Sequence, residues 1–297
     1  MPVCKAYAVS LIGLNGTVIE IEAEISSNLP SFVLVGLPDA SLSEARDRVR
    51  SAAHNSGLAL PGRRVTVNLS PASVPKRGSM FDLAISMAIL AADSKVQPDS
   101  VAKWIHLGEL GLDGSVRPVA GILPALLAAK RVGYNNFIVP LSNLTEAKMV
   151  EGVEVLGTST LRQVAAFHGA NLVAPALVFE CIQAEDHEPA QNAALDLSDV
   201  IGQDEAIDAL AIAAAGAHHL LMVGPPGSGK TMLAERLPSI LPPQSHDEAI
   251  ETAALRSIAH STGVISQRAL KGLRPFEAPH HSASLVSLIG GGTNFPR

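Results

Sequence analysis

The stretch that decides how this chain folds is Gly224-Pro225-Pro226-Gly227-Ser228-Gly229-Lys230-Thr231. It matches the phosphate-binding loop pattern G-x-x-x-x-G-K-[ST] at every fixed position. Residues 220–223 before it are an apolar run of strand length, and residues 232–237 after it are good helix formers. Because the pattern requires a strand, a glycine loop and a helix in this order, we predict a phosphate-binding loop rather than a glycine-rich turn that matches by chance.

The residue types in this loop suit a nucleoside triphosphate. Glycines let backbone N–H groups turn inward around phosphates without Cβ clashes, and the N-terminus of the following helix adds its positive dipole end. We expect the Lys230 amine to reach the β- and γ-phosphates and the Thr231 hydroxyl to bind Mg²⁺. The expected ligands are therefore ATP and Mg²⁺, held by residues 224–232, of which Met232 is the last.

The composition bounds the class of protein. A length of 297 residues suggests roughly two domains. Hydrophobic residues make up 47% of the chain and aromatic residues only 3%, so small aliphatic side chains must fill the cores. The formal net charge of −6 argues against a basic protein that coats nucleic acid, but not against a motor that grips DNA through a few local charges.

Several features favour the cytoplasm and argue against a membrane. Cys4 and Cys181 lie far apart without metal-ligand spacing, so we expect no disulfide scaffold and a reducing compartment. The first residues, Met1 to Lys5, lack the basic and apolar regions of a signal peptide. The longest apolar stretch, 207–223, is interrupted by polar side chains and a glycine, which makes it too polar to span a membrane.

The first 170 residues alternate between strand and helix patterns. Residues 6–13 and 17–25 alternate and are rich in Val, Ile and Leu, and Asn15-Gly16 between them predicts a hairpin turn. Further strands are predicted at 31–35, 64–69, 104–110, 136–140 and 153–156, and helices at 81–92, 122–131, 145–150 and 161–167. This mixture of hairpins and crossovers indicates an α+β domain.

One more helix is predicted to begin with Asp39 as its cap and to end near Asn55. Its expected buried stripe consists of Ala45, Val49, Ala52 and Ala53. The other faces carry Arg46, Arg48 and Arg50. A solvated helix surface is the favoured interpretation of these arginines, with a DNA or subunit contact as the alternative.

Between residues 171 and 195 the periodic pattern decays into polar and acidic residues, which predicts a linker. The linker separates an N-terminal domain, residues 1–170, from a C-terminal domain, residues 196–297. His187 has acidic neighbours with which it could bind metal, but a solvated linker is the favoured interpretation.

The C-terminal domain opens with Asp199-Val200-Ile201-Gly202-Gln203, and helices are predicted at 204–217 and 247–260. The pairs His218-His219 and His280-His281 could form a metal site. Because both pairs flank the predicted nucleotide-binding elements, packing or a loop near the nucleotide is the favoured interpretation.

The C-terminal third resembles the start of an AAA+ ATPase module of the magnesium-chelatase type. Residues 199–203 are similar to the segment that contacts adenine in such modules, so Val200, Ile201, Gly202 and Gln203 join the expected nucleotide site. Three further motifs resemble those of the ComM-type competence proteins, also called YifB or magnesium-chelatase-like proteins: Arg274-Pro275-Phe276, Pro279-His280-His281 and Gly290-Gly291-Gly292.

Motifs of the N-terminal half agree with this family: Val35-Gly36-Leu37-Pro38-Asp39, Asn55-Ser56-Gly57, Val67-Asn68-Leu69-Ser70-Pro71, Pro75-Lys76-Arg77-Gly78-Ser79 and Leu107-Gly108-Glu109-Leu110. The resemblance implies an N-terminal domain like the proteolytic domain of Lon, with the fold of ribosomal protein S5 domain 2. It also implies that a partial α/β P-loop NTPase (AAA+) module follows.

Lon-type proteases use a serine and a lysine, and the resemblance places these two positions at Met80 and Leu123. Ser79 lies one residue away from the nucleophile position. Because a nucleophile without its base cannot be activated, peptidase activity is disfavoured.

The family resemblance implies a hexameric, ATP-driven DNA motor that performs branch migration or helicase work in natural transformation. The alternative is a magnesium-chelatase-type motor that acts on a protein partner. The resemblance places the acidic Walker B strand, the sensor residue and the arginine finger beyond Gly292. The polypeptide is therefore expected to be a piece of a longer protein or to have lost hydrolysis. In either case we expect it to bind ATP but to turn it over negligibly.

Overall fold

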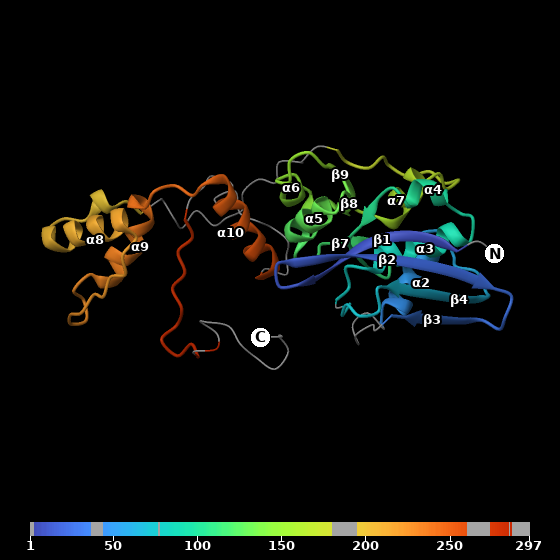
Figure 1. The fold of residues 1–297 in the computed structure, drawn as a ribbon, viewed down its shortest axis with the longest axis horizontal. Coiled ribbons are helices and arrows are strands. Elements are labelled where there is room, and N and C mark those ends of the chain that lie inside the picture. The colour runs from blue at the N-terminus through green and yellow to red at the C-terminus, as the bar shows by residue number, and fades with distance from the viewer. Residues whose placement is uncertain are drawn as a thin grey trace. The chain divides into compact units, whose positions relative to one another are not determined.

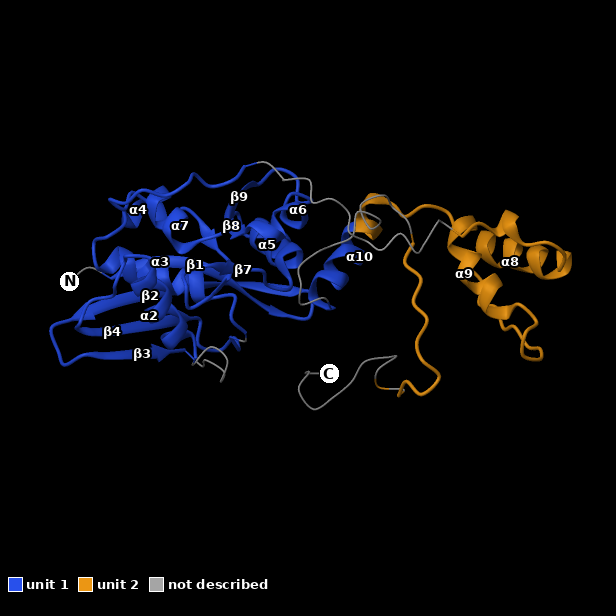
Figure 2. Ribbon diagram, turned by 180° about the vertical axis from the view of Figure 1, so that it is seen from behind, with its two compact units in different colours: residues 1–185, 250–266 blue, residues 186–249, 267–297 orange. Residues whose placement is uncertain are grey.

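The computed structural model describes residues 3–36, 44–76, 78–179, 195–259, 274–284 and 286. The chain divides into two compact units (Figure 2). Unit 1 comprises residues 1–185 and 250–266, and unit 2 comprises residues 186–249 and 267–297. The assignment of residues 250–266 to unit 1 was not foreseen from the sequence. His187, Cys181 and the triple glycine lie outside the described residues.

Unit 1 is built on a mixed seven-stranded sheet with the order β3-β4-β2-β1-β5-β8-β9 (Figure 1). Its strands are β1 Cys4–Ile12, β2 Asn15–Ser26, β3 Ser31–Val35, β4 Arg64–Ser70, β5 Ile105–His106, β8 Asn136–Pro140 and β9 Glu154–Thr158. The β1–β2 and β2–β4 pairs are antiparallel, and the other four pairs are parallel. A separate antiparallel pair consists of β6 Glu109–Leu110 and β7 Val116–Arg117.

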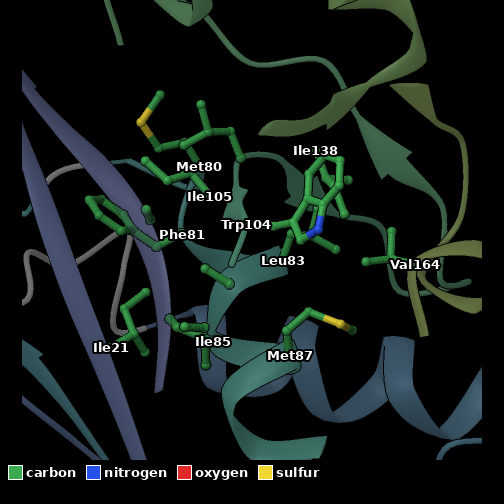
Figure 3. Packing of buried hydrophobic residues seen from close by; sticks show 14 of the residues in the cluster. Ile21, Met80, Phe81, Leu83, Ile85, Met87, Trp104, Ile105, Ile138 and Val164 are labelled. Atoms are coloured by element: carbon green, nitrogen blue, oxygen red, sulfur yellow. The ribbon is translucent and has the colours of Figure 1, made fainter. Parts of the chain in front are cut away.

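Helices cover both faces of the sheet around β1 and β2. The helices of this part are α2 Ala45–Asn55, α3 Asp82–Ala92, α4 Pro98–Val101, α5 Ile122–Arg131, α6 Leu144–Ala147 and α7 Leu161–Phe167, with a 3-10 turn at Leu141–Asn143. Figure 3 shows Ile21 of β2 beside Phe81 and Ile85, so α3 lies on the face that carries Ile21. Gly16 approaches Ala128 of α5. Since Gly16 is an odd number of residues from Ile21, α5 lies on the opposite face.

The hairpin turn is not where the sequence predicts it. Ile12 pairs with Asn15, so Gly13 and Leu14 make the turn and Asn15-Gly16 already belongs to β2. The glycine serves packing instead, because a Cβ on Gly16 would lie 2.5 Å from Ala128 Cβ. A close approach of a helix to a strand has the same sequence signature as a turn.

The other predicted elements of unit 1 are found with small differences. The stripe of α2 is buried as predicted, at Ala45, Val49, Ala52 and Ala53. The proposed cap Asp39 lies outside the described residues. The predicted strand 104–110 is two short strands, β5 and β6, because Gly108 (φ +152°) interrupts it. The mixture of α and β elements is confirmed.

The regular secondary structure in the described part of unit 2 is helical. It contains a 3-10 turn at Leu197–Asp199, α8 Asp204–Gly216, α9 Lys230–Ile240 and the first turn of α10 His246–Ala259. Its small core is formed by Leu197, Val200, Leu210 and Leu233. In the part of the chain that the structure describes, no helix combines the length and apolarity that crossing a bilayer requires.

The strand predicted at 220–223 is not formed. Leu221 and Val223 are 86% and 87% exposed, and unit 2 has no strand among its described residues. A strand needs a neighbour that satisfies its backbone N–H and C=O groups, and none lies beside this segment in the described part of unit 2. The segment before the glycine loop therefore has no regular secondary structure.

Candidate nucleotide-binding site

The glycine loop forms a turn that ends directly in a helix, as its pattern predicts. Gly229 is the N-cap of α9 and Lys230 is its first residue. Gly227 and Gly229 have φ values of +80° and +81°, which glycine adopts without strain. The loop therefore has the backbone that a phosphate-binding loop needs, and the N–H groups of the first turn of α9 are free of intrahelical partners.

The Lys230 side chain folds back over this loop. Its Nζ donates to the carbonyl oxygens of Gly224 and Pro225, both at 2.8 Å, and to Ser228 Oγ at 3.1 Å. These are exchangeable hydrogen bonds of a partly exposed amine. The ammonium group is thus already held at the mouth of the loop, where a phosphate group could take the place of the carbonyl oxygens.

The segment 200–203 meets the glycine loop at one point. A Cβ on Gly229 would lie 2.8 Å from Gln203 Nε2 and 3.3 Å from Met232 Cε. Gln203 itself has φ +60°, a left-handed conformation that is uncommon outside glycine. The structure therefore brings together two motifs that stand well apart in the sequence, and it holds one of them in a strained turn.

The side chains of this segment are divided between core and solvent. Val200 packs in the core of unit 2, so its side chain is not presented to a ligand. Ile201 is 96% exposed, and Gly202 follows it with φ +76°. An exposed aliphatic side chain on a tight turn offers apolar surface to a flat ring.

A set of contacts that the sequence analysis missed fixes α9 beneath the loop. Arg236 Nε donates to the carbonyl oxygen of Asp196 at 3.1 Å, and the Leu197 N–H donates to Ser239 Oγ at 3.1 Å. Asp196 caps the 3-10 turn through the Ser198 N–H, and this bond lowers the pKa of the Asp196 carboxyl. Arg236 and Ser239 lie three residues apart in α9, a spacing that could have indicated a shared face of the helix.

The remaining predicted ligands lie at the start of α9. Thr231 is exposed in its first turn, where its hydroxyl is accessible to a cation. Met232 packs against the core of unit 2 and against the Gly229 backbone. Of the two predicted ranges, the structure therefore brings together Gln203 at the end of the first and Gly229 and Met232 near the end of the second.

The histidine pairs do not converge on a metal site. No group of three His, Cys, Asp or Glu side chains with metal-ligand geometry occurs among the described residues. The ring centroids of His280 and His281 lie 4.1 Å apart with the rings tilted by 40°, and His280 Nδ1 lies 2.7 Å from Ser282 Oγ. The ring of His218 folds against Gly216 at the end of α8.

The two positions of the Lon serine and lysine are apolar and inaccessible in unit 1. Met80 and Leu123 both belong to the hydrophobic core. Ser79 donates instead to the carboxylate of Glu109, which is 3.8 Å from Arg117. No amine base accompanies the Ser79 hydroxyl in these contacts.

Comparison with known proteins shows which family this chain belongs to. Two family models match the chain, and both describe subunit ChlI of magnesium chelatase; one matches residues 21–143 and the other residues 196–297. The competence protein ComM of Haemophilus influenzae is 41% identical over 293 residues, which cover 99% of this chain and 57% of ComM. The chain belongs to the ComM/YifB family of magnesium-chelatase-like proteins.

Other ComM/YifB relatives show the same coverage. The protein YifB of Escherichia coli is 41% identical over 283 residues, or 95% of this chain and 54% of YifB. A protein of Mycobacterium tuberculosis is 47% identical over 299 residues, or 100% of this chain and 58% of the relative. The chain thus spans a little over half the length of these curated relatives.

The ComM/YifB chain is also similar to Lon proteases over part of its length. Lon protease 2 of Bacillus subtilis is 30% identical over 95 residues, which cover 32% of this chain and 17% of that protease. Met80 and Leu123, the positions at which the resemblance places the serine and the lysine, are both apolar.

Proposed function

We propose that this ComM/YifB protein binds ATP with Mg²⁺ through residues 200–203 and 224–232. The observation that carries the proposal is the contact between Gln203 and Gly229, which unites a base-contacting motif with a phosphate-binding motif. Lys230 Nζ, already over the loop, would pair with the phosphates, and Ile201 would offer apolar surface to the base. The ChlI family models that match both halves agree with this use of ATP and Mg²⁺.

The residues fit the metal as well. Nothing lies within 4 Å of the position that a Cβ would take at Gly227, so the loop is open there, and Thr231 is exposed in the first turn of α9. Thr231 and phosphate oxygens are hard oxygen donors of the kind that Mg²⁺ prefers. When bound, the ion would neutralise part of the phosphate charge.

For the whole protein we propose a nucleotide-driven, hexameric DNA motor of the cytoplasm that performs branch migration in natural transformation or recombination. The Haemophilus relative is named a competence protein, which supports a DNA-related role. In this proposal residues 1–170 form a Lon-like domain with the S5-like fold. Residues 196–297 begin the AAA+ module, and residues 171–195 link the two.

A second candidate is a chelatase-type motor that acts on a protein partner, and it is favoured by the ChlI description of both family models. Labelled branched and single-stranded DNA distinguish the two by fluorescence anisotropy. A DNA motor predicts that ATP with Mg²⁺ changes the DNA affinity of the wild-type protein but not of Lys230→Ala. DNA affinity that is absent, or indifferent to ATP in the wild type, would favour the protein partner.

A further inference from the structure

Helix α10 is shared between the two units. Its first turn, through Ala249, belongs to unit 2, and residues 250–259 belong to unit 1 (Figure 2, where the colour changes along α10). A helix is a stiff rod because every interior residue adds a backbone hydrogen bond. A rod with one end in each unit can carry a displacement from one to the other.

The unit 1 end of α10 is held by small side chains and a backbone bond. Ala253, Ala254 and Ser257 are buried, whereas Leu255 on the other side of the helix is 55% exposed. The Gly121 N–H, at the start of α5, donates to the Ser257 carbonyl oxygen at 3.0 Å. Small residues on one stripe let the helix backbone approach α5 closely.

A buried carboxylate completes this seat. Glu146 is 2% exposed and accepts from the Leu123 N–H at 2.8 Å, from Asn143 Nδ2 at 3.2 Å and from the Ser257 hydroxyl. Burial raises the pKa of Glu146, and these three donors oppose the shift. Two of the donors belong to the body of unit 1, and only Ser257 comes from α10.

This chemistry suits an interface that opens and closes. If α10 leaves, water can replace the Ser257 hydroxyl on Glu146, so the carboxylate is hydrogen-bonded in both states. This contact stabilises the docked position and fixes the register of the helix, because any slip would leave a buried charge underbonded. The seat therefore fits a two-position element better than a permanent core contact.

The unit 2 end of α10 follows the nucleotide loop closely in the sequence. Helix α9 begins at Lys230, and only residues 241–245 separate its end from α10. Arg274 donates to the Pro242 carbonyl oxygen at 2.9 Å and to Glu248 Oε2 at 3.4 Å, so it clamps this connection to the first turn of α10. A movement of the loop and α9 therefore has a short, braced path to α10.

We propose that α10 is a latch through which nucleotide binding at the glycine loop is coupled to unit 1, with Ser257 and Glu146 as its catch. This inference rests on the proposed ATP binding. By linkage, ATP must change the docking equilibrium of α10 by the same factor by which docking changes ATP affinity. Couplings of this kind are typically fivefold or more.

Two amides of unit 1 report on the latch separately. The Gly121 N–H is bonded to α10, whereas the Leu123 N–H is bonded to Glu146 within the body of unit 1. Hydrogen exchange of the whole protein, resolved to single amides, should show Gly121 exchanging at least about fivefold faster in Ser257→Ala than in the wild type. Leu255→Ala, on the exposed side of α10, is the matched control and should leave Gly121 unchanged.

Saturating ATP with Mg²⁺ should shift Gly121 exchange in the wild type by a similar factor, and not in Lys230→Ala. Equal exchange rates of the Gly121 amide in Ser257→Ala and the wild type would refute the latch and leave the proposed nucleotide site unaffected. So would ATP binding, seen by calorimetry, that leaves Gly121 unaltered. Absence of any ATP binding by the wild type would instead refute the proposed function and, with it, the coupling.

Discussion

The side-chain amide of Gln203 lies against the backbone of Gly229, so close that a Cβ on Gly229 would come within 2.8 Å of Gln203 Nε2. One residue ends the segment before α8 and the other caps α9. Their contact joins the two halves of the proposed nucleotide site, and the first prediction tests it.

Gly229→Ala should destabilise unit 2 by about 2–3 kcal/mol, because left-handed backbone strain and a clash with Gln203 add together. In a Gln203→Ala background the clash is gone, and the same substitution should cost only about 1 kcal/mol. Thermal unfolding followed by far-ultraviolet circular dichroism measures the four corners of this cycle. Equal costs in both backgrounds would show that the two residues do not touch.

Arg48→Met should destabilise unit 1 by about 3 kcal/mol, because it leaves the buried carboxylate of Asp82 without its cation. Arg48 Nε lies 2.6 Å from Asp82 Oδ2, and Asp82 is fully buried. Urea unfolding can be followed at Trp104, the single tryptophan, which lies in unit 1. Arg46→Met is the control, since in the described part of the chain Arg46 pairs with the exposed Asp47, and it should cost no more than about 0.5 kcal/mol.

The same substitution has a pH signature. Burial raises the pKa of Asp82, and the Arg48 guanidinium opposes that rise. Without Arg48 the pKa of Asp82 in the folded state rises further. The Asp82 carboxyl therefore destabilises the fold well above its unfolded pKa of about 4, where it would be charged, and hardly at all below that pKa. The deficit of Arg48→Met should therefore shrink as pH falls toward 4. A deficit that is constant from pH 4 to 8 would argue that packing, not the charge, is lost.

Two buried histidines should make unit 1 sensitive to acid. His106 Nε2 and His168 Nε2 lie 2.9 Å apart, and both side chains are fully buried. Burial lowers the pKa of His168 to about 4, and burial together with His168 lowers the pKa of His106 well below its ordinary value. Between about pH 6.5 and 4 the unfolded chain binds more protons than the folded one, so the free energy of unfolding decreases as the pH is lowered. His168 alone accounts for about 3 kcal/mol of this decrease.

Urea unfolding at a series of pH values measures this slope. His168→Gln should reduce the loss of stability between pH 6.5 and 4, whatever its effect at neutral pH. His54→Gln, on the exposed surface of α2, is the matched control and should keep the wild-type slope. A His168→Gln slope identical to that of the wild type would mean that other groups govern the acid response.

Gly16→Ala should destabilise unit 1 by about 1–3 kcal/mol, because the added Cβ would overlap Ala128 of α5. Gly62→Ala is the control, since nothing lies within 4 Å of a Cβ there. Unfolding followed at Trp104 compares the two. A tolerated alanine at Gly16 would contradict the close approach of β2 to α5 at this position.

The sequence predicted much of unit 1 because its signals are local. The stripe of α2 and the strand at 64–69 follow directly from the periods of helix and strand. The turn at Asn15-Gly16 failed because a glycine required by a distant helix looks like a glycine required by a turn. The docking of Ser257 on Glu146 could not be predicted, because it joins residues 111 positions apart through one hydroxyl and one carboxylate.

For the nucleotide site, the sequence supplied the residues and the structure supplied their proximity. The glycine loop and the segment 200–203 were both identified from motifs. Their contact through Gln203 and Gly229, and the bracing of α9 by Arg236, depend on tertiary packing that no motif encodes. At 220–223 the local signal for a strand was present, but no strand formed. Strand propensity alone is not sufficient where no neighbouring strand pairs with the segment.

The most direct test of the account is isothermal calorimetry of ATP with Mg²⁺ against the folded protein and its Lys230→Ala variant. We predict saturable binding of one ATP per chain to the wild type and at least a tenfold weaker affinity for the variant, the loss expected when one charged contact to phosphate is removed. No binding heat with the wild type, or equal affinities for the two proteins, would contradict the assignment of residues 224–232 as a nucleotide site.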